Sequence, residues 1–466
     1  MSKIKFGTDG WRAIIAEDFT VNNVVRVSEA VSQYVKNKGK SRIVIGHDCR
    51  FAGRLFMENA MRVFVADGIE VLYAEGFVST PMVSYGCAKY DAFIGVVLTA
   101  SHNPPSYNGY KLKAYYGGPL GPEEVQVVED MIPDIPKDYS QMTWDDLINS
   151  PLVSLVDLEK DYLDAVRANF DLNAINESGL KLAFDAMYGA GQRVVRQILN
   201  DVKEFHCDYN PSFMGQAPEP IEKNLLEVAG FLKKNPGYAA ALAIDGDADR
   251  IGLFNGSGEF IDSHHIILLL IHYMVKYKGM TGKVVTAFSC TPRIKRLCEH
   301  YGLEHETVKI GFKYIAGKMV EGDVLLGGEE SGGIAIKGHI PERDGIWMGL
   351  VIFEFMAKSG KSLDGLIEEI YEIVGAFKFE RNDLHITEEL KQKIIEACKN
   401  NAYSNFGSYT ISRVETVDGY KFFFDDERWV MIRPSGTEPV LRVYAEAPTI
   451  EEVREMLKQT SEAITR

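Results

Sequence analysis

The chain has few cysteines and no recognisable cysteine pair. Its 466 residues contain six cysteines, which are scattered and include no C-x-x-C. Neither a disulfide framework nor a zinc site is therefore expected, and we predict reduced, buried thiols in a cytoplasmic protein. The amino-terminal stretch MSKIKFGTDGWR also lacks the apolar core of a signal peptide.

Long apolar runs and an excess of positive charge are also missing. Apolar runs such as 266–271 are far shorter than the roughly 20 residues of a membrane-spanning helix. Asp and Glu outnumber Lys and Arg by 66 to 51, which gives a net charge of -15. Because nucleic acids and anionic membranes bind basic surfaces, we expect neither as a partner. An anionic substrate would need Lys and Arg residues that are gathered locally against this charge.

Two common nucleotide-binding motifs do not occur. The sequence contains no G-x-x-x-x-G-K-[ST], which excludes a P-loop. Gly189-Ala190-Gly191 follows an expected strand, but Val194 stands where a dinucleotide-binding motif has Gly or Ala. We interpret this stretch as tight packing between a strand and a helix.

The length predicts several domains, and one pattern recurs three times. Segments that begin at Arg42, Leu180 and Lys283 each read as an apolar strand, a turn, an amphipathic helix and a second strand. In the second segment, Val194, Val195, Ile198 and Leu199 have helical spacing. The recurrence predicts three related α/β domains, each with a mixed or parallel sheet.

The pattern of expected elements changes after Lys378, from strands that alternate with helices to a run of strands. Four strand-like runs followed by a helix predict a smaller α+β domain there. The expected strands are 409–414, 420–424, 429–433 and 441–446, and the expected helix is 450–464. Linker-like stretches at 133–151, at 255–258 and near Gly375 place the expected domains at 1–152, 153–254, 255–374 and 375–466.

The run TASHNPPSYNGYK, residues 99–111, places a hydroxyl nucleophile on a rigid loop. It follows an expected buried strand at 93–98, and its Pro-Pro and Asn-Gly pairs favour a turn over a helix. Ser101 has His102 beside it and Lys111 ten residues later. This arrangement favours catalysis. The alternative is a surface loop whose Ser and Asn side chains bond their own backbone.

Three aspartates follow a second apolar strand, at 239–244. In AIDGDADRIG, Asp245, Asp247 and Asp249 alternate with small residues, and an extended backbone would place them on one side. Such carboxylates repel one another unless a cation lies between them. Oxygen ligands without His or Cys favour Mg²⁺, whereas the spacing does not fit an EF-hand. The alternative is a solvated acidic turn.

Two further loops offer groups for a phosphorylated sugar. In LGGEESGGIAIKGHIPERDG, four glycines bracket Glu329, Glu330 and Ser331, whose oxygens suit sugar hydroxyls, although such a loop alone is weak evidence. In IRPSGTEPVLRVYAE, Arg433 precedes Ser435, Gly436 and Thr437, a set that suits a phosphate dianion unless it is merely an exposed turn.

Taken in order, TASHNP with its downstream Lys, DGDADR, GGEESGG and RPSGTEP resemble the motifs of the α-D-phosphohexomutase family. The resemblance covers essentially the whole chain. It implies three related α/β domains and a carboxy-terminal α+β domain around a central cleft, in agreement with the recurrence above. The four expected domains would carry, in order, the phosphoserine, metal-binding, sugar-recognition and phosphate-binding loops.

The resemblance also implies roles for the candidate residues. Ser101 would carry a phosphoryl group, and Asp245, Asp247 and Asp249 would hold Mg²⁺ together with an oxygen of that phosphoserine. The remaining implied residues are Arg250 near the same phosphate, Glu329 and Ser331 on sugar hydroxyls, Arg433, Ser435, Gly436 and Thr437 on the non-reacting phosphate, and Arg12, His102 and Lys111 around the reacting centre. Lys111 and His102 are the candidate general bases.

The implied activity is the interconversion of hexose 1-phosphate and hexose 6-phosphate through a phosphoserine. A hexose 1,6-bisphosphate would be the intermediate, with glucose 1,6-bisphosphate as activator. The only expected partner is a small-molecule sugar phosphate, and we expect a monomer or homodimer. Alternatives are a phosphomannomutase, a bisphosphate synthase or phosphatase, and a sugar-phosphate or nucleotide binding protein. The last is disfavoured because the nucleophile and all three carboxylates are present.

Within the family, GEESGG and GFKYI look more like phosphoglucomutases than like mannose or glucosamine mutases. Glucose is therefore the first choice of sugar and mannose the second. Dual-specificity bacterial members carry His where Gly333 and Phe312 stand here. Lys313 is the candidate replacement for these histidines, and His339 with Arg343 would add cationic surface.

Overall fold

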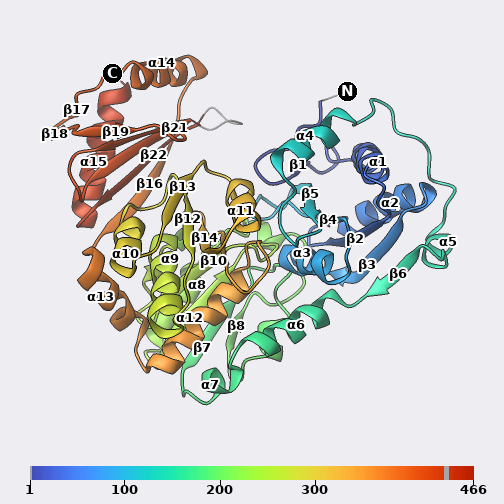
Figure 1. Cartoon of the computed structure of the whole chain (residues 1–466), viewed down its shortest axis with the longest axis horizontal. Coiled ribbons are helices and arrows are strands. Elements are labelled where there is room, and N and C mark those ends of the chain that lie inside the picture. Colours follow the sequence, from blue (N-terminus) through green and yellow to red (C-terminus); the bar gives the residue numbers. More distant parts are fainter. Residues whose placement is uncertain (1–2, 435–439, 466) are drawn as a thin grey trace. The chain divides into compact units, whose positions relative to one another are not determined.

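The structure is a computed structural model that describes residues 3–434 and 440–465 (Figure 1). The chain divides into two compact units, Met1–Val285 with Gly311–Ile367, and Thr286–Ile310 with Glu368–Arg466. Among the described residues, no helix is both long and apolar enough to cross a membrane. The six cysteines, all of which are described, are free as predicted, and Cys207 is the one that is not fully buried.

The first unit contains a six-stranded sheet with the order β1-β5-β4-β2-β3-β6. Strand β2 runs parallel to β3 and β4, whereas β5 is antiparallel to β4 and β1. The strands are β1 (Trp11–Ile14), β2 (Arg42–His47), β3 (Glu70–Phe77), β4 (Ile94–Leu98), β5 (Tyr107–Ala114) and β6 (Val153–Val156). The accompanying helices are α1 (Val21–Asn37), α2 (Gly53–Ala66), α3 (Thr80–Lys89), α4 (Pro122–Asp130) and α5 (Trp144–Ile148).

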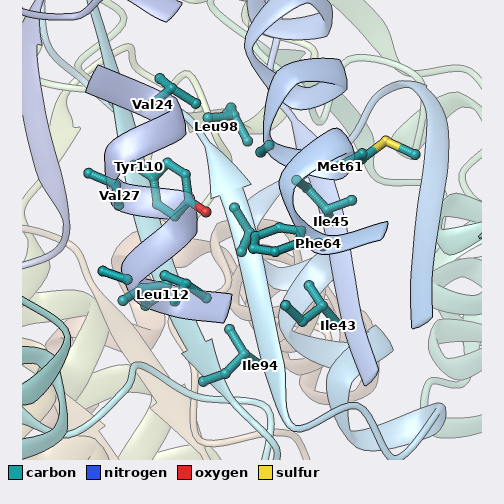
Figure 2. Packing of buried hydrophobic residues seen from close by; sticks show 14 of the residues in the cluster. Val24, Val27, Ile43, Ile45, Met61, Phe64, Ile94, Leu98, Tyr110 and Leu112 are labelled. Atoms are coloured by element: carbon teal, nitrogen blue, oxygen red, sulfur yellow. The ribbon is translucent and has the colours of Figure 1, made fainter. Parts of the chain in front are cut away.

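The core of this sheet lies beneath α1 and α2. Alternate residues of the central strands point to one face, where they meet apolar side chains of both helices. Figure 2 shows Val24 and Val27 of α1 and Phe64 of α2 against Ile45 of β2 and Leu98 of β4. Burial of such side chains stabilises the sheet by about 25 cal/mol per Å² of apolar surface. The stable sheet in turn holds the strand ends that carry the candidate residues in fixed positions.

A second sheet in the same unit has the order β11-β10-β9-β7-β8, and its strands β10-β9-β7-β8 repeat the arrangement of β5-β4-β2-β3. Strand β7 is parallel to β8 and β9, and β10 is antiparallel to β9 and β11. The strands are β7 (Lys181–Asp185), β8 (Lys203–Phe205), β9 (Tyr238–Ile244), β10 (Ile251–Asn255) and β11 (Phe260–Ile261). The helices are α6 (Leu158–Asn169), α7 (Leu172–Asn176) and α8 (Leu226–Lys234), with 3₁₀ turns η1 (Val195–Gln197), η2 (Phe213–Gly215) and η3 (Glu222–Asn224).

The prediction of a helix after β7 is wrong. Met187 and Tyr188 have left-handed backbone, and the residues after them form turns closed by bonds such as Gln197 N–H to the Val194 carbonyl. The one regular piece is the short turn η1. Val194, Val195, Ile198 and Leu199 are buried as a helix face would be, but by a tightly turning chain. Periodicity alone cannot separate these two cases.

The rest of the first unit includes β14 (Val324–Gly328), which is antiparallel to β15 (Ile334–Ile336). Its other elements are α9 (Ser263–His272), which continues into the π-helical turn η4 (Tyr273–Tyr277), α11 (Phe312–Glu321) and α12 (Gly345–Ser359). Strand β12 (Lys283–Ala287) and helix α13 (Leu363–Val374) lie where the chain passes between the two units.

The second unit is built on an antiparallel sheet with the order β16-β22-β21-β20-β19. Helix α15 packs on it through Val453, Met456 and Leu457. The elements are α10 (Arg293–Tyr301), β13 (His305–Val308), β16 (Lys378–His385), α14 (Glu388–Lys399), β17 (Asn405–Phe406), β18 (Tyr409–Thr410), β19 (Arg413–Glu415), β20 (Tyr420–Phe423), β21 (Trp429–Pro434), β22 (Val440–Ala447) and α15 (Ile450–Thr465).

The predicted fold class, α/β sheets followed by a smaller α+β part, is confirmed. The strand expected at 409–414 is two short strands, β18 and β19, while the other three expected strands and the terminal helix are present. Strand β16 and helix α14 were not anticipated. The proposed boundaries between four domains stay a prediction.

Candidate active site

Ser101 lies at the start of the loop between β4 and β5, where the sequence predicted a nucleophile. Its side chain is buried, and its backbone is left-handed, with a φ of 51°. The Oγ donates a hydrogen bond to Asp245 Oδ2 at 2.7 Å and lies 3.2 Å from Nδ1 of His102. The predicted nucleophile and the first predicted metal ligand are therefore in direct contact.

The three aspartates lie in the loop between β9 and β10. All three are buried, and one ligand oxygen from each lies within 4.8 Å of the others. They converge because the chain turns at Ala248, which has a φ of 63° and donates its N–H to the Asp245 carbonyl at 3.0 Å. The predicted convergence is present, but a turn produces it and not the extended alternation that we expected.

The carboxylate oxygens fit a hard divalent cation. Among the described residues, Oδ1 of Asp247 and Oδ1 of Asp249 are buried and have no hydrogen-bond partner. Burial and the two neighbouring carboxylates raise the pKa of Asp245 well above its usual range. A cation held by these oxygens would relieve both the repulsion and the unmet bonding.

Lys111 of β5 neutralises part of this charge. Its Nζ lies 2.8 Å from Asp247 Oδ2, 2.9 Å from Asp249 Oδ2 and 2.7 Å from Asp9 Oδ2. Burial alone would lower the pKa of Lys111, but these carboxylates outweigh it and raise the pKa above the ordinary value. The three carboxylates therefore favour the charged ammonium form of Lys111, and its role as a general base stays a prediction.

Asp9 and Arg343 complete this ionic network, and neither was assigned this position from the sequence. The Arg343 guanidinium lies 2.7 Å from Asp249 Oδ2 and also binds Asp9. A signal for Asp9 was its place in FGTDGWR, three residues before the candidate Arg12. Arg343 was expected on the surface with His339, and this expectation is wrong for both residues.

The loop that carries these two residues is packed inside the first unit. The His339 ring stacks on Trp347 with centroids 3.7 Å apart, and its Nε2 lies 3.0 Å from Asp344 Oδ2. Arg343 is 4% exposed. Neither side chain therefore contributes a cationic surface.

Two further candidate residues, Arg12 and Arg250, form hydrogen bonds at the serine loop and at the carboxylate loop. Arg12 of β1 donates from Nη1 to Asn103 Oδ1 at 2.8 Å, and the Arg250 backbone N–H donates to Asp245 Oδ1 at 3.0 Å. Burial, followed by the charges of these and other cations, lowers the pKa of His102 well below its usual range. The geometric support for His102 as a candidate base is its Nδ1, which lies 3.2 Å from the Ser101 Oγ.

The loop between β14 and β15 carries the residues expected to bind sugar hydroxyls. Glu329 Oε1 accepts the Gly311 N–H at 2.8 Å, and burial, opposed by Arg343, raises the pKa of Glu329 to about 7. The Ile251 N–H donates to the Gly332 carbonyl at 3.2 Å, which joins this loop to the end of the carboxylate loop.

Three predicted residues are not drawn into this network. Ser331 and Lys313 are half-buried, and among the described residues no hydrogen bond or ion pair joins them to the serine loop. Arg433, at the end of β21 in the second unit, has its Nε 3.3 Å from Asp418 Oδ1. Ser435, Gly436 and Thr437 lie outside the described residues, so the phosphate-binding loop stays a prediction.

Comparison with known proteins places these loops in a family context. Phosphoglucomutase/phosphomannomutase patterns match in order: alpha/beta/alpha domain I at residues 3–138, domain II at 160–258, domain III at 262–374 and the C-terminal domain at 380–463.

Individual relatives match over nearly the whole chain. A Thermococcus kodakarensis protein named phosphoglucomutase/phosphomannomutase is 30% identical over 461 residues, which cover 97% of this chain and 96% of its own. A Methanococcus maripaludis phosphoglucosamine mutase is 29% identical, with coverage of 97% and 96%. The crystal structure of a Thermus thermophilus protein named "putative phosphomannomutase" matches with a TM-score of 0.88 and 32% identity, and all of both chains is covered.

Proposed function

The chain belongs to the phosphoglucomutase/phosphomannomutase family and is a phosphohexomutase, and from this premise we propose that it acts on glucose phosphates through a phosphoserine at Ser101. The observation that carries the proposal is the contact of Ser101 Oγ with Asp245, beside two buried carboxylate oxygens of Asp247 and Asp249 that, among the described residues, have no partner. Such a site can hold a phosphoryl group on Ser101 next to a cation that neutralises the charge of that group.

The proposed cycle consists of two transfers. In the first, the bond between Ser101 Oγ and phosphorus breaks while the free hydroxyl of a hexose phosphate bonds to that phosphorus, giving a hexose 1,6-bisphosphate. In the second, the bisphosphate turns over, the bond between its other phosphoryl group and the sugar oxygen breaks, and that phosphorus bonds to Ser101 Oγ. Because the transferred group is strongly anionic, the protein contributes mainly by positioning and by positive charge.

The buried side chains divide these tasks. His102, whose Nδ1 lies 3.2 Å from Ser101 Oγ, is placed to take the proton from the attacking hydroxyl and to pass it to Ser101 Oγ as the bond to phosphorus breaks. Lys111, Arg12 and Arg250 are suited to neutralise phosphate oxygens. When bound by Asp245, Asp247 and Asp249, Mg²⁺ would supply further positive charge at the phosphoryl group.

Glucose is proposed as the preferred sugar on the basis of GEESGG and GFKYI, with Glu329 and Ser331 on the ring hydroxyls and Arg433 with residues 435–437 on the non-reacting phosphate. Mannose and glucosamine phosphates are the other candidates, because relatives of similar identity are named for these sugars. Values of kcat/KM for glucose, mannose and glucosamine 1-phosphates, measured on one preparation, would decide between them.

The phosphoserine is tested with Ser101→Ala. We expect the substitution to abolish isomerisation, a loss on the order of a thousandfold or more, while the melting temperature stays close to that of the wild type. Incubation with glucose 1,6-bisphosphate should add one phosphoryl group to the wild-type chain and none to the variant, as read by intact-protein mass spectrometry. Retained turnover in the variant, or net release of phosphate by the wild type in place of isomerisation, would contradict the proposal.

A further inference from the structure

Ser101 has a backbone conformation that few residues with a side chain adopt. Its φ of 51° lies in the left-handed region, where the Cβ of an L-residue crowds the backbone. A residue remains in this region only when its surroundings hold it there. The direction of the Ser101 Oγ therefore depends on contacts to the peptide groups on both sides of the residue.

Two side chains hold these peptide groups. On the amino side, the Ser101 N–H donates to Thr99 Oγ1 at 2.9 Å. On the carboxyl side, Arg50 Nη2 donates to the Ser101 carbonyl at 2.6 Å. The same guanidinium also donates to the carbonyls of Asn103, Pro104 and Tyr107, at 2.7, 2.9 and 3.0 Å.

Both side chains are anchored on one carboxylate, that of Asp48. Its Oδ2 accepts the Thr99 hydroxyl at 2.5 Å and lies 3.3 Å from Arg50 Nε, and its Oδ1 accepts the Arg50 backbone N–H at 2.9 Å. The side chains of Asp48 and Arg50 are both completely buried. Asp48 directly follows β2, one of the two central strands of the sheet, so its position is fixed by the core.

We propose that Asp48 is a positioning residue for phosphoryl transfer, because it holds Thr99 and Arg50 so that they fix Ser101 in the left-handed conformation that directs its Oγ toward Asp245. This inference rests on the proposed role of Ser101. Within the described residues, no hydrogen bond or ion pair joins Asp48 to the proposed cation ligands or to Glu329. Its loss should therefore slow transfer without weakening the binding of sugar or cation.

The test compares Asp48→Asn with Asp161→Asn. Asp161 is a matched control because its carboxylate also accepts one cationic nitrogen and one hydroxyl, from Lys89 and Tyr90, both at 2.5 Å. The measurements are kcat and KM, the single-turnover rate at which glucose 1,6-bisphosphate phosphorylates Ser101, the half-saturating Mg²⁺ concentration and the melting temperature.

For Asp48→Asn we expect kcat and the phosphorylation rate to fall on the order of 100-fold, as misplacement of a reacting group by about 1 Å can cause. KM and the half-saturating Mg²⁺ concentration should stay within about twofold. Asp161→Asn should lower the melting temperature without changing either rate. A phosphorylation rate in Asp48→Asn equal to that of the wild type would overturn the inference, as would equal rate losses in the two variants.

A second pair keeps the test decisive if Asp48→Asn does not fold. Thr99→Val removes the hydroxyl link between Asp48 and the Ser101 N–H, whereas Thr99→Ser retains it. We expect the rate of Ser101 phosphorylation to fall in the valine variant and to recover in the serine variant, and equal rates in both would overturn the inference. If the wild type itself is never phosphorylated on Ser101, the proposed function fails. If the wild type is phosphorylated and the variants are phosphorylated at the same rate, the proposed function stands and the positioning role of Asp48 fails.

Discussion

The serine loop after β4 and the carboxylate loop after β9 occupy the same place in two sheets that share the arrangement of four strands. In each sheet, the preceding strand is parallel to one neighbour and antiparallel to the strand that follows the loop. Each loop also contains a non-glycine residue with left-handed backbone, Ser101 in one and Ala248 in the other. The loop that carries Glu329 likewise joins two antiparallel strands, β14 and β15.

The two loops differ in what supports them. The serine loop is held from within its own sheet, by Asp48, Arg50 and Thr99. The carboxylate loop is balanced from outside, by Lys111 of the first sheet and by Arg343. A nucleophile needs a fixed direction, which hydrogen bonds from a rigid neighbour provide, whereas clustered carboxylates need countercharge, which must come from other segments.

Removal of Lys111 should produce the largest effect on stability, because it takes away the countercharge that the carboxylate loop receives from the first sheet. In Lys111→Met, the buried carboxylates of Asp247 and Asp249 and the half-buried carboxylate of Asp9 lose their shared cation. We expect a loss of about 3–5 kcal/mol in the free energy of unfolding, measured by urea denaturation.

Mg²⁺ should restore part of this loss if the carboxylates bind it. Lys160→Met, which breaks an exposed pair with Asp164, is the control and should cost less than about 1 kcal/mol. A Lys111→Met protein as stable as that control would show that the carboxylate loop does not depend on outside charge.

The loop between β14 and β15, which carries Glu329, predicts that the stability of the protein depends on pH. The pKa of Glu329 is raised to about 7 from an ordinary 4.5, so the native state holds this proton more tightly than the unfolded chain does. Its contribution to stability is therefore full below about pH 4.5 and is lost as the pH rises through 7, at a cost on the order of 3 kcal/mol.

Glu329→Gln removes this titration, and its side-chain carbonyl can still accept the Gly311 N–H. We expect the variant to be more stable than the wild type at pH 8 and close to it at pH 5, as measured by denaturation at both values. Parallel pH profiles for the two proteins would mean that burial of this carboxylate does not matter.

The smallest expected effect comes from a comparison of an aspartate in the carboxylate loop with an equally buried aspartate at the end of β7. In Asp247→Asn, an oxygen proposed to bind the cation becomes part of an amide, and we expect the half-saturating Mg²⁺ concentration to rise about tenfold, read from activity against Mg²⁺. Asp185→Asn is the control. Asp185 is equally buried at the end of β7, but it pairs with His206 and the Met187 N–H. An equal rise of the half-saturating Mg²⁺ concentration in both variants would contradict the proposal that Asp247 binds the cation.

Much of the fold could be read from local patterns, and the failures have a common cause. The runs before Ser101 and Asp245 are buried strands because continuous apolar stretches of this length fit the centre of a covered sheet. The helix expected around Val195 failed because buried residues with helical spacing also occur where the chain turns tightly. Strand β16 was missed since its residues are mostly polar and partly exposed, so its identity comes from pairing with β22.

The candidate nucleophile and the three carboxylates were recognisable from residue type and spacing, because turn-forming prolines and short acidic repeats act over a few neighbouring residues. Two of their partners, Asp9 and Arg343, were not. Asp9, Lys111, Asp247, Asp249 and Arg343 form one ionic network although up to 334 positions separate them. Charge pairing depends on distance in space, and only the packed sheets bring such segments together. Whether a cationic residue is on the surface or is buried against a carboxylate, as Arg343 is, follows from that packing and not from its neighbours in the chain.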